Sequence, residues 1–377
     1  MKAIRAPRRP VMLLVAWLAI MYQGTAAAGT PPLAAARVPS LPRVGCTGGW
    51  QSLPIKLGTA DTLRSIAARS RKDAWVVGNG VDMRHGRLSS LAWRWRGTNW
   101  HRFDPPNDLG RDSILTSVAA ISTDDVWAVG YSEDRNYVRR SLAEHWDGTG
   151  WSIVPTPDVS QAVLTAVSGS SPRNVWAVGN SGSVTLTEHW DGRAWTVVPS
   201  PPEAGGFVTG VAVTSPTNAW LVGTYTFNDD SPPFLMRWDG VQWTVVSIPL
   251  PFDSFSFLSD ISADSTGDAW AVGYDQESGA STWRVFTEHW DGATWSMAGG
   301  VSPAAVSEFL HVSARSPTDV WAVGTIGEDT VSGLTEHWDG TSWTVVDDAA
   351  TAPGGDVVAL RSGRAMALGG PGVELYC

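Results

Sequence analysis

Short runs in which apolar and polar residues alternate follow one another along most of the chain, with turn-forming residues between them. Such alternation is typical of β-strands, because successive strand side chains point to opposite faces of a sheet. Asp-Gly pairs separate many of the runs, and Gly provides the positive φ of a tight hairpin. The pattern therefore predicts units of four short antiparallel strands. In the unit 113–157 these strands are expected at residues 115–122, 126–130, 141–146 and 151–154.

The four-strand unit is repeated along the sequence. Each copy carries Asp/Asn-x-Trp-x-Val-Gly and, after a variable gap, Trp-Asp-Gly-x-x-Trp or a close variant. A period near 50 residues is typical of solenoids and propellers. Apolar residues fall on both faces of each sheet, so each sheet needs a neighbour on either side, and radial packing provides both. A parallel β-helix is disfavoured because its coils are shorter and lack Asp-Gly hairpins. The first Trp of each copy is Trp75, Trp127, Trp176, Trp220, Trp270 or Trp321, at spacings of 52, 49, 44, 50 and 51 residues.

Six complete copies, and a seventh assembled from both chain ends, predict an all-β, seven-bladed propeller of four-stranded antiparallel blades. Cys46 and Cys377 stand at the two broken ends of the hairpin that would join the last two strands. In an oxidising compartment these two cysteines are predicted to form a disulfide. The last blade is expected to take three strands from residues 357–360, 365–369 and 373–376, and its fourth from residues 49–54.

The N-terminus has the features of an export signal. Four basic residues precede the apolar run 11–22, and an Ala-rich segment follows it. These features predict a secretory signal peptide over 1–28, a Pro- and Ala-rich linker over 29–45 and the propeller over 46–377. The expected location is extracellular, although an uncleaved anchor and either the general secretory or the twin-arginine route stay open. The four basic residues are Lys2, Arg5, Arg8 and Arg9.

The charge balance excludes some partners. The chain has 27 Lys and Arg against 37 Asp and Glu, a net charge of −10, and without the leader the balance is 23 against 37, or −14. Nucleic acids and anionic membranes attract basic surfaces, so neither is an expected partner. Most of the 22 Trp residues occupy repeat positions and are expected in the core. A monomer that binds an extracellular glycan or protein is predicted.

Four Glu-His-Trp triplets suggest metal or acid–base chemistry, but the predicted geometry opposes it. Equivalent positions of neighbouring blades are about 10 Å apart or more, whereas zinc–ligand bonds are about 2 Å. Adjacent Glu and His side chains also point to opposite faces of a strand. Structural roles are therefore predicted, with hydrogen bonds between blades, and no catalytic residue, metal or cofactor is assigned. The triplets are Glu144-His145-Trp146, Glu188-His189-Trp190, Glu288-His289-Trp290 and Glu336-His337-Trp338.

The motifs resemble those of known propellers. Trp-Asp-Gly-x-x-Trp resembles the Asp-box turn of bacterial sialidases, and the repeat resembles kelch units in length and strand number. The closest resemblance, over about 45–377, is to secreted bacterial repeat proteins containing Asp-Val-Trp-Ala-Val-Gly and His-Trp-Asp-Gly-Thr-Ser-Trp. This resemblance implies the propeller fold and no catalytic residues. The Asp-box-like residues are Asp147, Asp191, Asp239, Asp291 and Asp339.

The connections between strands predict two different rims. Turns between strands one and two, and between strands three and four, are uniform among the repeats, and they lie on one rim, here called the uniform rim. The other connections vary and form the opposite, variable rim, where ligand-binding loops are expected. Unit two contributes a charged loop, 133–137, interpreted as solvated surface.

The richest variable loops belong to units four and five. Their aromatic rings and carboxylates suit sugars or cationic peptides, although these aromatics would also serve to cap the blades. We expect a secreted, non-enzymatic scaffold; the alternative is a sialidase-like hydrolase or lyase using Asp229, Asp253 and Asp275. The candidate ligand-binding residues are Tyr225, Phe227, Asp229, Asp230, Phe252, Asp253, Phe255, Tyr274, Asp275, Glu277 and Trp283, with Phe257 beside them.

Overall fold

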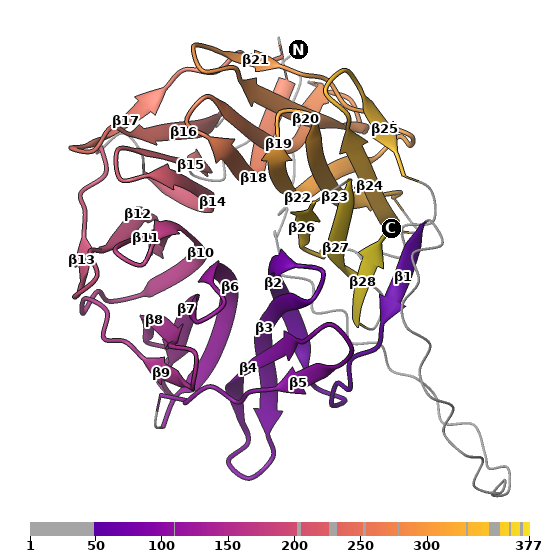
Figure 1. Cartoon of the computed structure of the whole chain (residues 1–377). Coiled ribbons are helices and arrows are strands. Elements are labelled where there is room, and N and C mark those ends of the chain that lie inside the picture. The colour runs from indigo at the N-terminus through magenta and orange to yellow at the C-terminus, as the bar shows by residue number, and fades with distance from the viewer. Residues whose placement is uncertain are drawn as a thin grey trace, which may run out of the picture. The chain divides into compact units, whose positions relative to one another are not determined.

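Figure 1 shows the computed structural model of the chain, which separates into the units Met1–Val44 and Gly45–Cys377. The predicted signal peptide and linker, together with Cys46, lie outside the described residues. Within the described part of the chain, no helix is long and apolar enough to cross a membrane. The structure describes residues 49–377 except 109, 202–204, 226–231, 252–253, 278, 329–330, 347–354, 362 and 370–371.

Seven four-stranded antiparallel sheets form a ring, and this confirms the predicted propeller (Figure 1). The first strand of each sheet lies nearest the central opening. Blade 1 contains β2 (Thr62–Ser70), β3 (Asp73–Asp82), β4 (Arg87–Trp95) and β5 (Trp100–Arg102); blade 2 contains β6 (Asp112–Ser122), β7 (Asp125–Glu133), β8 (Arg139–Trp146) and β9 (Trp151–Ile153); blade 3 contains β10 (Ala162–Ser171), β11 (Asn174–Ser181), β12 (Val184–Trp190) and β13 (Trp195–Val197).

The remaining blades follow the same order. Blade 4 contains β14 (Gly206–Ser215), β15 (Asn218–Tyr225), β16 (Pro233–Trp238) and β17 (Trp243–Val246); blade 5 contains β18 (Ser254–Ser265), β19 (Asp268–Glu277), β20 (Trp283–Trp290) and β21 (Trp295–Met297). Blade 6 contains β22 (Ser307–Ser316), β23 (Asp319–Ile326), β24 (Ser332–Trp338) and β25 (Trp343–Val345); blade 7 contains β26 (Val357–Leu360), β27 (Arg364–Gly369), β28 (Gly372–Tyr376) and β1 (Trp50–Leu53).

Blade 7 closes the ring with strands from both chain ends, as predicted. β1 pairs antiparallel with β28, and Trp50 lies opposite Tyr376. The backbone N–H of Cys377 donates to the Gly49 carbonyl at 3.2 Å. These contacts place the end of the chain beside residue 49, while the Cys46–Cys377 disulfide stays a prediction because Cys46 is not described.

Tryptophans hold neighbouring blades together. Trp75 of β3 packs against Trp146 and Trp151 of blade 2, with ring centroids 5.0 and 5.2 Å apart. At the interface between blades 6 and 7, Tyr376 takes the place that Trp146 has in blade 2, and its ring lies 4.8 Å from that of Trp321. Aromatic pairs of this kind contribute about 0.5–1.5 kcal/mol beyond their buried area. Trp127, Trp176, Trp220 and Trp270 repeat the arrangement with Trp190 and Trp195, Trp238 and Trp243, Trp290 and Trp295, and Trp338 and Trp343.

Asp-Gly turns form the hairpins between the third and fourth strands, as predicted. Asp147 Oδ1 accepts hydrogen bonds from the backbone N–H groups of Thr149 and Gly150, at 2.8 and 3.0 Å. Gly148 has φ +95°, in the left-handed region that side chains disfavour. A side chain at position 148 would also meet Asp124 of the neighbouring turn at 2.9 Å. Asp191, Asp239, Asp291 and Asp339 form equivalent turns.

Candidate functional site

The histidines of the repeated triplets hold their own blades together. His145 Nε2 lies 2.8 Å from Asp125 Oδ1, and its ring packs on Trp127 with centroids 4.4 Å apart. Arg94 of blade 1 takes the same place, with its Nε 2.9 Å from Asp73 Oδ1. Bonds between blades were expected for the histidines, but these bonds lie within a blade, because the first Asp or Asn of each repeat is the nearest acceptor. Arg94 makes both kinds of bond, since its Nη2 also donates to the Thr123 carbonyl of blade 2 at 3.3 Å. His189, His289 and His337 bond likewise to Asn174, Asp268 and Asp319, and Arg237 bonds to Asn218.

The glutamates of the triplets point the other way and are fully buried between blades. Burial raises the pKa of Glu144 to about 8, although a hydrogen bond from Ser90 opposes the shift. Ser90 Oγ donates to Glu144 Oε1 at 2.8 Å and so links blade 1 to blade 2. Trp93 and Met236 occupy the equivalent position in blades 1 and 4. Since apolar residues fill this position equally well, its role is packing. Burial likewise raises the pKa of Glu188 to about 7, of Glu288 to about 8 and of Glu336 to about 7.

The central channel contains a charged cluster that the sequence analysis missed. A cavity of about 270 Å³ is lined by the inner strands, and His311 lies there between two carboxylates. Its Nδ1 is 3.6 Å from Asp260 Oδ2 and 3.7 Å from Asp356 Oδ1. Burial lowers the pKa of His311, but Asp356 and Asp260 outweigh this and raise it to about 9. The three residues stand at equivalent positions of blades 5, 6 and 7, so aligning the repeats would have revealed the cluster.

The channel cluster ties the closing blade to its neighbours. Asp356 Oδ2 accepts hydrogen bonds from Ser65 Oγ and the Ile66 N–H of blade 1, both at 2.9 Å. Asp260 Oδ2 accepts from the Val312 N–H of blade 6 at 3.1 Å. Because both carboxylates are bonded to the backbone of the next blade, the arrangement stabilises the ring. Among the described residues, no group of three or more His, Cys, Asp or Glu side chains could hold a metal ion.

Blade 5 presents a stack of aromatic rings on the variable rim. Phe257, Tyr274 and Trp283 come from three adjacent strands; the first two rings are 5.4 Å apart with an 18° interplanar angle, and the last two are 4.9 Å apart at 11°. Tyr274 continues the face of Trp270 and Val272, which pack toward blade 6. Burial and the charge of Glu308 raise the pKa of Tyr274 to about 12. We call these three residues the blade 5 ring stack.

The other predicted ligand residues are divided among different faces. Tyr225 packs against Phe234 at 5.0 Å, in the core between blades 3 and 4. Asp275 alternates with Tyr274, so it lies on the opposite face of β19, where Arg284 reaches it at 3.2 Å. Phe255 shares the face of Phe257, and Glu277 is exposed at the end of β19. Phe227, Asp229, Asp230, Phe252 and Asp253 lie outside the described residues.

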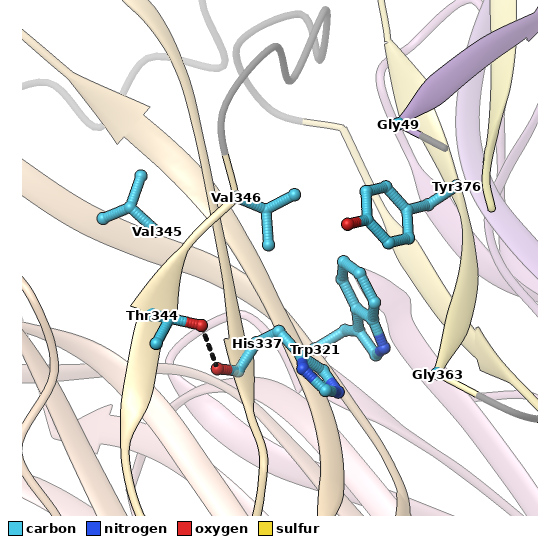
Figure 2. Close-up of a pocket in the computed structure, with 8 residues that line it drawn as sticks. All are labelled: Gly49, Trp321, His337, Thr344, Val345, Val346, Gly363 and Tyr376. Atoms are coloured by element: carbon cyan, nitrogen blue, oxygen red, sulfur yellow. Dashed lines mark hydrogen bonds between the residues drawn. The ribbon is translucent and has the colours of Figure 1, made fainter. Parts of the chain in front are cut away.

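A pocket at the seam between blades 6 and 7 was also missed. It has a volume of about 440 Å³, and its lining includes His337, Thr344 and Val346 of blade 6 and Tyr376 of blade 7. Figure 2 shows the Tyr376 ring beside Trp321, with the Tyr hydroxyl directed toward Val346. Trp50 is 6.0 Å from Trp321, whereas the equivalent pairs elsewhere are 5.0–5.3 Å apart. Only this pair is wider where the repeat is interrupted, since Tyr376 lies 4.8 Å from Trp321.

Comparisons with known proteins show the fold. No family model matches the chain, and no curated protein does. Among solved structures, YCF48 bound to D1 peptide is 17% identical, with 87% of this chain and 94% of that chain covered and a TM-score of 0.55. YCF48 from Cyanidioschyzon merolae is 16% identical over 87% and 98%, with a TM-score of 0.55. The RRP9 WD40 repeats are 11% identical over 88% and 98%, with a TM-score of 0.57.

Proposed function

We propose that the protein is an extracellular, non-catalytic propeller that binds a glycan or a protein through its variable rim. The blade 5 ring stack is the observation that carries this proposal. Its three rings are half-buried, lie on three strands of one sheet and stand where loops differ among the blades. Function on a rigid scaffold usually resides in such variable connections.

The ring stack has physical properties that suit recognition. Trp283 ends the stack, so Tyr274 covers only one of its faces. The backbone N–H of Trp283 donates to the Ala305 carbonyl at 2.9 Å, which fixes the strand against the loop that leads to blade 6. A ring held in place loses little conformational entropy on binding, and an indole face offers dispersion and CH contacts to a sugar or an apolar side chain.

An extracellular location is supported by the N-terminal sequence. The basic residues before the run 11–22 and the Ala-rich segment after it are typical of a signal peptide. Expression of the full chain in a bacterial host should release a protein that begins near residue 29 into the exported fraction. N-terminal sequencing of that fraction tests this part of the proposal, and a chain that retains its leader in the cytoplasm would contradict it.

The binding role is tested with the exported chain on a glycan array and in pull-downs with extracellular proteins. A ligand of the ring stack should lose affinity about tenfold in Trp283→Ala, the cost of removing one aromatic anchor. Met297→Ala is the control, because Met297 is 53% exposed on the outer edge of the same blade. A folded chain with no ligand in either screen, or equal losses in both variants, would oppose the proposal. Release of reducing ends from polysaccharides would instead support the hydrolase or lyase alternative.

A further inference from the structure

Two hairpins on the variable rim of blades 1 and 2 expose their apolar side chains to an unusual degree. Among large apolar side chains of the described residues, Met83, Val241 and Tyr137 are the most exposed, at 86%, 82% and 75%. Met83 lies in the β3–β4 hairpin and Tyr137 in the β7–β8 hairpin, both on the variable rim. Val241 lies in a hairpin of the uniform rim. Two of the three most exposed apolar side chains therefore belong to neighbouring blades on one rim.

Both hairpins are fixed by an aspartate at the same place. Asp82 Oδ1 accepts the Arg84 N–H at 2.8 Å, and Asp134 Oδ1 accepts the Asn136 N–H at 2.8 Å. Asp134 Oδ1 also accepts the Val138 N–H at 3.1 Å. These bonds hold each turn in one conformation, so the exposed side chains are presented by ordered backbone.

Tyr137 adopts a backbone conformation that an aromatic residue seldom takes. Its φ is +61°, in the left-handed region, which costs a side-chain-bearing residue about 1 kcal/mol or more. The hydrogen bond from its N–H to the Asp134 carbonyl at 3.0 Å holds the residue there. Packing of the ring does not offset this cost, since Tyr137 is 75% exposed. A cost of this kind without a packing gain is typical of functional positions.

Adjacent residues hold the two hairpins in one surface. Asp112 Oδ1 accepts the Leu88 N–H at the start of β4, at 3.0 Å. Its neighbour Arg111 reaches Asp134 of the second hairpin, with Nη2 3.6 Å from Oδ2. The surface therefore spans both blades as one supported unit. We call it the Met83–Tyr137 surface; it consists of Met83, Arg84, His85, Arg135, Asn136 and Tyr137.

The charge of this region differs from that of the remaining ring. Residues 49–157, which contain blades 1 and 2, carry 14 Lys and Arg against 12 Asp and Glu, a net charge of +2. Residues 158–377 carry 7 against 25, a net charge of −18. Arg84 and Arg135 are exposed, and neither makes an ion pair among the described residues. The surface thus combines exposed apolar anchors with two exposed arginines, while the hairpin carboxylates Asp82 and Asp134 are engaged by His85 and Arg111.

We infer that the Met83–Tyr137 surface docks an acidic segment of a partner protein. Tyr, Met and Arg are the residue types enriched at the centres of protein interfaces. Arg84 and Arg135 would pair with carboxylates, and the Tyr137 ring and Met83 side chain would enter apolar depressions of the partner. An anionic polysaccharide fits less well, because the apolar groups protrude from this surface. The surface is also separate from the two cavities described above, which are lined by other residues. This site is distinct from the blade 5 ring stack.

Selection of displayed random peptides on the exported full chain tests the inference. Peptides rich in Asp and Glu with apolar neighbours should be recovered, and synthetic copies are titrated by fluorescence polarisation. Tyr137→Asn introduces a residue that tolerates the left-handed conformation, so the turn should keep its shape. Loss of the ring should nevertheless weaken peptide binding about tenfold. Arg135→Glu should weaken binding by a similar factor and reduce its salt dependence.

Two control variants match these changes on the uniform rim. Val241→Ser removes an equally exposed apolar group, and Arg193→Glu makes the same change of net charge; both should bind the peptides as the parent chain does. Circular dichroism confirms that each variant is folded. Recovery of no peptides, recovery of basic peptides, or equal binding by all variants would overturn the inference.

Two further outcomes would assign the surface to a different partner and so also overturn it. In the first, alginate or heparin binds more tightly than any peptide, with loss in Arg135→Glu and none in Tyr137→Asn. In the second, sedimentation shows that the chain self-associates and that Arg135→Glu abolishes this. The ring stack variant Trp283→Ala should leave peptide binding unchanged, so failure here is separate from failure of the proposed glycan or protein binding at blade 5.

Discussion

The blade 5 ring stack and the Met83–Tyr137 surface occupy the same rim and differ in nearly every physical property. The three rings of blade 5 are half-buried and stack on one another, in a region of net negative charge. The side chains of blades 1 and 2 protrude singly from aspartate-locked turns, in a region with most of the basic residues. Beneath both lie the same Trp clusters and Asp-Gly turns. The difference shows that the repeat determines the Trp clusters and Asp-Gly turns beneath the rim, while the connecting loops determine which ligand each part of the rim suits.

The largest expected loss of stability affects both regions alike, because it acts on the two strands of blade 7 that close the ring. A Cys46–Cys377 disulfide would close a loop of more than 300 residues, for which chain entropy gives an upper limit of about 5 kcal/mol. Reduction should therefore lower the free energy of unfolding of the whole ring by several kcal/mol, measured from the shift of its denaturation midpoint. Thiol titration of the denatured, unreduced chain should find no free thiol. The double variant Cys46→Ser/Cys377→Ser is the control and should not respond to reductant; two free thiols in the parent chain would refute the disulfide.

A core substitution beneath one region tests how far the support is shared. Trp75 lies between blades 1 and 2, and Trp270 lies between blades 5 and 6; both are at most 1% exposed. Trp75→Ala and Trp270→Ala should each cost about 3–5 kcal/mol, measured by denaturant unfolding. Hydrogen exchange should show the first opening blades 1 and 2 before the others, and the second opening blades 5 and 6. Uniform loss of protection in both variants would mean that the ring unfolds as one unit and that the two regions do not differ in local stability.

The sequence predicted most of the shared blade packing and the Asp-Gly turns, but few of the contacts that loop residues make on the variable rim. Trp127 and Gly148 stand at fixed places in a repeat, so packing and turn type followed from the repeat alone. Tyr225 and Asp275 were grouped with Tyr274 because they stand at the variable loops of units four and five. Alternation along β19 directs Asp275 to the other face of its sheet, and Tyr225 packs between blades 3 and 4. The face of each residue could have been counted from the repeat's Gly, whereas the contacts of loop residues depend on turns that have no repeat to compare.

Buried glutamates should make the stability of both regions depend on pH. Burial raises the pKa of Glu288, between blades 4 and 5, from its ordinary value of 4.5 to about 8. The folded chain therefore binds more protons than the unfolded chain between these values, and the free energy of unfolding should fall as pH rises from about 4.5 to about 8. Glu288→Gln should flatten this dependence, measured as denaturant midpoints over the pH range.

A matched variant at the equivalent position of blade 4 sharpens the pH test. Met236 is fully buried where other blades have glutamate. Met236→Glu should steepen the loss of stability with rising pH and be tolerated best at acid pH, because the new carboxyl is neutral there. Identical pH profiles for the parent chain, Glu288→Gln and Met236→Glu would contradict the assignment of these glutamates as buried neutral groups.

The smallest effect separates the two regions most directly, because it depends on backbone strain present in only one of them. Among non-glycine residues that the structure describes, Tyr137 and Gln161 have positive φ, and no residue of the blade 5 ring stack does. Tyr137→Asn should raise the free energy of unfolding by up to about 1 kcal/mol, since Asn tolerates this conformation and little burial is lost. Tyr274→Asn, which removes a stacked ring from unstrained backbone, should lower it. Thermal unfolding of the two variants beside the parent chain distinguishes strain held for binding from packing that stabilises the fold; a loss of stability in Tyr137→Asn would show that the exposed ring contributes to folding after all.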